Sequence, residues 1–101
     1  MKICEKDGTI VDIFAVYFID NETMFYGVIK NYGGLIAFKE ADVSVIDRSF
    51  TGRYVFFKEG VFHWALIEER LLDDLLEHDE AAYKKFLKIL KEEKLLEENF
   101  F

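Results

Sequence analysis

The sequence predicts an α+β protein, an antiparallel meander sheet of five to six strands followed by two C-terminal helices packed on one face. Two observations predict this class. Up to about residue 66, β-branched and aromatic residues dominate and are interrupted by Gly, Asn and Asp; beyond it Leu, Glu and Lys dominate and glycine is absent. The 101 residues suit a single domain spanning 1–101, with strands over about 9–66 and helices over about 67–94.

Six segments have strand composition and are separated by turn signals. They are 9–19, 23–30, 35–39, 43–48, 53–58 and 61–66. The first is apolar on both faces except at Asp12, which predicts a central strand that is covered on both sides. The links between the segments are short, and Glu59-Gly60 is a two-residue hairpin signal, so consecutive strands are expected to pair.

Two amphipathic helices are expected after the strands. The first places its apolar residues on one arc, comprising Ile67, Leu71, Leu72, Leu75 and Leu76. Asp79 is the expected N-cap of the second helix. The buried arc of this second helix is expected to contain Ala82, Tyr83, Phe86, Ile89 and Leu90.

Extending the second helix beyond Glu92 would bring Glu93 and Glu97 into its apolar arc. The helix is therefore expected to end or bend near Glu92. The apolar residues that follow are Leu95, Leu96, Phe100 and Phe101. This tail either docks on its own sheet, the more ordinary arrangement, or forms a homodimer interface.

Cys4 is the only cysteine, which excludes an intrachain disulfide and a zinc site built on several thiolates. A single free thiol fits a reducing compartment. The N-terminal residues lack the pattern of a signal peptide, and no apolar run approaches the length of a membrane span. We therefore expect a cytoplasmic protein.

No motif identifies a chemistry. His63 and His78 have no partner at metal-ligand spacing, and their ordinary interpretations are a half-buried strand histidine and a loop histidine. There is no nucleophile elbow and no glycine-rich phosphate loop. Asp12 is expected to pair with Arg48 or Arg53, or otherwise to serve a ligand. We expect no catalysis, no metal and no cofactor.

Charge distribution is the most informative functional signal. A net charge of −7 repels nucleic acid and anionic membranes. The acids are concentrated between residues 68 and 80, and their ordinary role would be to keep a helix face solvated. A functional interpretation is a docking surface for a basic protein. The candidate partner-binding residues are Glu69, Asp73, Asp74, Glu77, Asp79 and Glu80, with the turn aromatics Tyr32 and Phe50.

These observations favour a small acidic inhibitor of a basic enzyme, such as a nuclease toxin domain. Bacterial immunity proteins that neutralise nuclease toxins have this general character, although no motif here matches one of their families. One alternative is a small-molecule-binding or enzymatic domain with an aromatic-lined pocket. Its lining would come from Phe14, Tyr17, Phe25, Tyr26, Phe57 and Trp64. A further alternative is a subunit of an oligomeric assembly, and mimicry of DNA is a weaker one.

Overall fold

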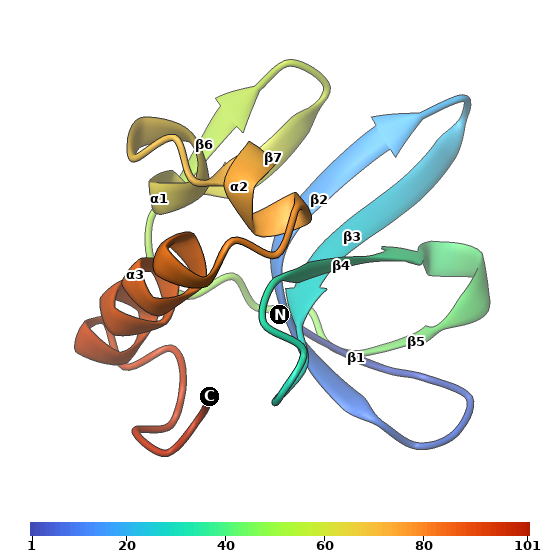
Figure 1. Cartoon of the computed structure of the whole chain (residues 1–101). Helices are drawn as coiled ribbons and strands as arrows, with labels where there is room; N and C mark the ends of the chain where they lie inside the picture. Colours follow the sequence, from blue (N-terminus) through green and yellow to red (C-terminus); the bar gives the residue numbers. More distant parts are fainter.

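The computed structural model describes all residues from 1 to 101 and confirms the predicted class, an antiparallel sheet followed by C-terminal helices (Figure 1). The strands are β1 Lys2–Cys4, β2 Ile10–Ile19, β3 Glu22–Val28, β4 Leu35–Lys39, β5 Ser44–Asp47, β6 Tyr54–Phe57 and β7 Gly60–His63. The helices are the 3-10 turn η1 Glu40–Asp42 and the α-helices α1 Trp64–Glu68, α2 Leu72–Leu76 and α3 Glu80–Glu92.

The sheet has seven strands. Five of them follow the order β4-β3-β2-β1-β5; in addition, β7 pairs with β2, and β6 pairs with β7. Strand β1 had not been expected, because a three-residue strand with Ile3 as its only buried residue gives almost no periodic signal. It separates β5 from β2, and β5 pairs with β1 instead of with β4. The meander prediction therefore holds for the hairpins β2–β3, β3–β4 and β6–β7, but β5 pairs with neither β4 nor β6.

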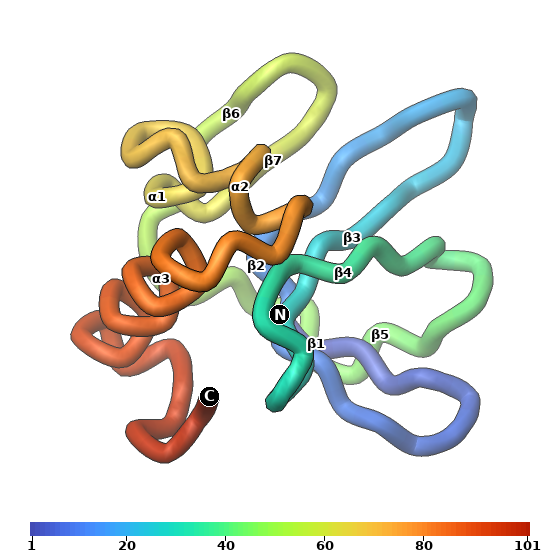
Figure 2. Tube along the Cα trace, viewed as in Figure 1, coloured from blue at the N-terminus to red at the C-terminus, as the bar shows by residue number.

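Strand β2 is central, as predicted, and it contributes to two cores. An irregularity between Ile13 and Ala15 inserts Phe14 into β2 opposite β3. Ile13 belongs to the smaller core, whereas Phe14 and Ala15 both belong to the larger core beneath the helices. The larger core comprises Phe14, Ala15, Val28, Leu35, Phe62, Ala65, Leu66, Leu71, Leu75, Ala82, Tyr83, Phe86, Leu87, Leu90 and Leu96. The smaller core comprises Ile3, Val11, Ile13, Phe25 and Phe38. Strand β3 lies along one edge of β2, and β1 and β7 lie along the other. The part of the sheet that contains β1 and β3–β5 lies away from α3 (Figures 1 and 2).

The helical region begins earlier than predicted and contains three α-helices instead of two. Residues 64–66, expected to continue a strand, form the start of α1. The His63 side chain accepts a hydrogen bond from the Ala65 backbone N–H and so caps this helix. The single helix expected from Ile67 onward is interrupted at Arg70, whose φ of 54° lies in the left-handed region and separates α1 from α2.

Helix α3 confirms the predicted N-cap, because Asp79 Oδ1 accepts a hydrogen bond from the Ala82 N–H at 2.8 Å. It also ends at Glu92, as expected. The tail then turns back, Leu96 is buried in the larger core, and the Phe101 carbonyl accepts a hydrogen bond from the Asn31 N–H at 2.8 Å. The tail therefore packs on its own chain. None of the helices has the length and apolarity needed to cross a membrane.

Candidate functional site

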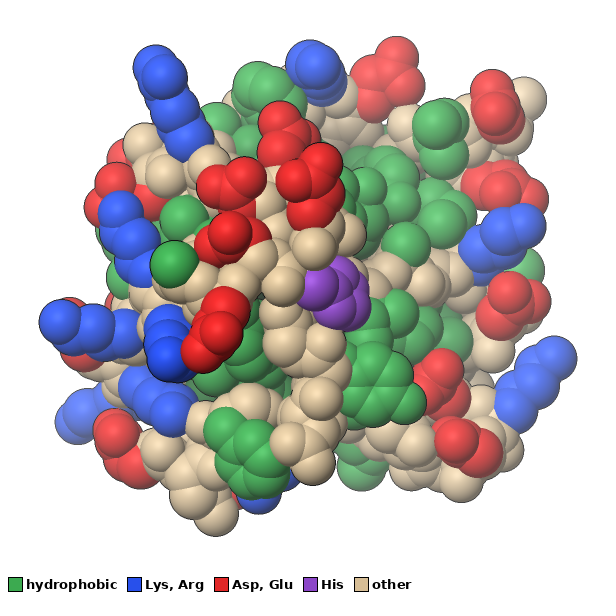
Figure 3. Space-filling model, viewed as in Figure 1, with side chains coloured by type: hydrophobic (Ala, Val, Ile, Leu, Met, Phe, Trp, Pro, Cys, Tyr) green, Lys and Arg blue, Asp and Glu red, His purple; other side chains and the backbone are tan.

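The six predicted acidic residues are all exposed and lie along one continuous stretch of the helical region. Glu69 caps the end of α1, Asp73 and Asp74 lie in α2, and Glu77 caps its end. Asp79 and Glu80 begin α3. Figure 3 shows acidic side chains gathered over α2 and the turn that leads to α3.

Local partners neutralise some of these acids and leave others free. Glu80 pairs with Lys84 at 2.9 Å and Glu69 with Lys85 at 3.7 Å. Asp79 is occupied by capping α3. The remaining three acids have no ion-pair partner, and we call them the α2 carboxylates: Asp73, Asp74 and Glu77. Of the six predicted acids, those without a local partner therefore lie on α2 and at its C-terminal end.

An apolar groove of about 1010 Å³ lies beside α2. Its walls come from the outer end of the β2–β3 hairpin, the β6–β7 turn, and the segment from α1 to α2. Fourteen residues line it: Tyr17, Phe18, Ile19, Tyr26, Phe57, Lys58, Glu59, Phe62, Leu66, Ile67, Arg70, Leu72, Asp73 and Leu76. In Figure 3 the apolar surface beside the acidic cluster is hollowed.

Aromatic rings line much of the groove. The Tyr17 ring packs against Tyr26 with centroids 4.5 Å apart and stacks with Phe62 at 6.5 Å. Phe57 meets Phe62 edge-on at 6.1 Å. Gly60 permits this arrangement, because a Cβ there would lie 2.7 Å from the Cβ of Tyr17.

Strand lengths explain why the groove is open. Strand β7 pairs with β2 only from Ala15 to Tyr17, whereas β3 follows β2 to Ile19. The end of the hairpin therefore projects beyond β7, and the side chains of Phe18 and Ile19 are 53% and 51% exposed.

The chemistry of the groove is suited to binding. Burial, with a contribution from the neighbouring Tyr26 hydroxyl, raises the pKa of Tyr17 above its ordinary value. Charged groups occur at the rim, including Lys58 on the β6–β7 turn and Asp73 on α2. This combination of apolar centre and charged rim is typical of protein interfaces.

The structure brings together some of the aromatic residues expected around a pocket. Tyr17, Tyr26 and Phe57 line the groove. Phe14 and Phe25 instead fill the larger and the smaller core, respectively. Trp64 lies outside the groove, where its indole donates a hydrogen bond to Glu93.

The two predicted turn aromatics lie in different places. Tyr32 is 57% exposed in the β3–β4 turn. That turn packs closely against the end of α2. Gly34 allows this approach, since a Cβ atom added there would lie only 2.6 Å from the Leu75 carbonyl oxygen. Phe50 packs against Tyr54 with ring centroids 4.8 Å apart. The loop between β5 and β6, which contains Phe50, contacts Leu95 just beyond the C-terminal end of α3. Phe50 therefore lies far from the acidic residues at the N-terminal end of that helix.

A buried polar cluster was not predicted. The His63 side chain is fully buried, instead of half-buried as expected, and its Nε2 lies 2.6 Å from Glu93 Oε1. Trp64 Nε1 donates to Glu93 Oε2, also at 2.6 Å. Because His63 Nδ1 already accepts from the Ala65 N–H, the neutral ring carries its proton on Nε2 and donates it to Glu93. Burial lowers the pKa of His63, against the opposing effect of Glu93.

Asp12 has a different partner from the two expected. Its carboxylate is half-buried and lies 3.7 Å from the Lys2 ammonium. Burial raises the pKa of Asp12, and Lys2 opposes that shift. Arg53 is instead held by Glu68, with 2.9 Å between Arg53 Nη2 and Glu68 Oε1, and it also lies over the Trp64 ring. The expectation of an Arg48 or Arg53 partner was therefore wrong, because β1 places Lys2 opposite Asp12.

Comparisons with known proteins give no match: no family model, no curated protein and no solved structure resembles this chain significantly.

Proposed function

We propose that this chain is a small acidic, protein-binding inhibitor that acts in the bacterial cytoplasm on a basic enzyme. A nuclease toxin domain is the partner class that the charge favours, because a site that holds phosphates is itself basic. An acidic surface docked over such a site would occlude it and repel its nucleic acid substrate. This would be the mode of action of an immunity protein.

The observation that carries the proposal is the uncompensated charge of the α2 carboxylates beside an apolar groove. Neighbouring lysines already pair with Glu69 and Glu80, but Asp73, Asp74 and Glu77 remain free for an external partner. Charges of this kind steer association with an oppositely charged protein and raise its rate. The overall charge of −7 adds to this attraction.

The groove also favours the second function expected from the sequence, binding of a small apolar molecule. Its volume is at the upper end of the range usual for ligand sites, and three of the expected aromatics line it. The groove adjoins the α2 carboxylates through Asp73, so the two surfaces are parts of one candidate site.

Affinity capture with charge-matched variants tests the proposal. The test variant reverses the α2 carboxylates (Asp73→Lys, Asp74→Lys, Glu77→Lys), and the control reverses three exposed acids elsewhere (Glu40→Lys, Asp42→Lys, Glu97→Lys). Both variants change the net charge equally. We expect wild type and control to retain a basic protein from a lysate of the source cells at low salt, and the test variant to lose it. Retention of the same partner by the test variant would contradict the proposal.

The activity of the captured partner is the second measurement. If it is a nuclease, wild type should inhibit it and the α2 variant should not. A partner that is acidic, or whose activity is unchanged on binding, would count against the inhibitory function.

A further inference from the structure

We draw no further inference here: the strongest candidate, the apolar groove between the β2–β3 hairpin, the β6–β7 turn and the segment from α1 to α2, is lined by two cations, Lys58 and Arg70, that balance two acids, Glu59 and Asp73, and nothing in the structure shows what covers it.

Discussion

His63 illustrates at the residue scale how a single polar side chain links distant segments. It follows the buried strand residue Phe62, caps α1 and meets Glu93 from the end of α3. Glu93 had a visible signal in the sequence, since it fell inside the apolar arc of the predicted helix. The pairing itself was not predictable, because 30 residues separate the two partners and the fold alone brings them together.

The His63 cluster predicts that stability falls in mild acid. Burial holds the pKa of His63 below its unfolded value, so the folded chain binds fewer protons than the unfolded chain does. The neutral ring therefore contributes stability at neutral pH, and this contribution is lost as pH falls from about 6.5 through the lower folded pKa. Protonation would also remove Nδ1 as the acceptor for the Ala65 N–H.

Urea unfolding at about pH 7.5 and about pH 5.5 measures this effect. Wild type should be less stable at the lower pH, and His63→Gln should show a smaller difference between the two values. His78→Asn is the control, because His78 is exposed, and it should behave as wild type does. An unchanged pH difference in His63→Gln would show that other groups cause the effect.

At the element scale, the sequence predicted the long β2 and α3 well and the short elements poorly. The ten residues of β2 and the thirteen of α3 each carry a sustained pattern. The break between α1 and α2 depends on the positive φ of Arg70, a residue type that gives no turn signal. Strand β1 is too short for alternation to appear.

The C-terminal tail is an element whose packing can be tested directly. Leu96 is buried in the larger core and Phe100 packs against it, but Phe101 stays 53% exposed with the Lys30 ammonium over its ring. Removal of Phe100 and Phe101 should therefore lower the free energy of unfolding by roughly 1–2 kcal/mol. Light scattering should show the same molar mass before and after truncation. A fall from dimer to monomer would instead support the tail as a homodimer interface.

At the scale of the whole molecule, the sequence predicted the chemistry of the candidate surface but not its shape. The acidic residues were visible as a run between positions 68 and 80, and the structure shows which of them local lysines neutralise. The groove forms because the β2–β3 hairpin extends beyond the shorter strand β7. Residues of the β2–β3 hairpin, the β6–β7 hairpin and the segment from α1 to α2 line it. No local pattern encodes that geometry.

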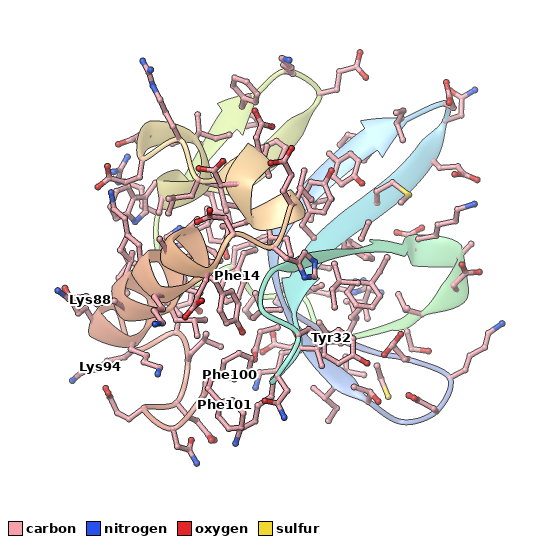
Figure 4. All side chains as sticks on the ribbon, in the orientation of Figure 1. Phe14, Tyr32, Lys88, Lys94, Phe100 and Phe101 are labelled. Carbon is pink, nitrogen blue, oxygen red and sulfur yellow. The ribbon has the colours of Figure 1, made fainter.

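The arrangement of charge also predicts how the molecule meets its partner. Lys84 and Lys85 of α3 pair with Glu80 and Glu69, whereas Lys88 lies further along the helix from the α2 carboxylates, where Figure 4 labels it. Glutamates at positions 92, 93, 97 and 98 accompany the lysines at that end, so the larger excess of acid lies at the α2 end. A basic partner is attracted most strongly to the α2 end, so the charges orient it during encounter.

The most direct test is the association rate of the captured partner, measured by stopped flow at about 0.05 M and about 0.5 M salt. Because the α2 carboxylates are exposed and free, the rate for wild type should fall by about tenfold or more at the higher salt. The variant with Asp73, Asp74 and Glu77 reversed should associate slowly at both concentrations. A wild-type rate that is independent of salt and equal to that of the variant would contradict the account.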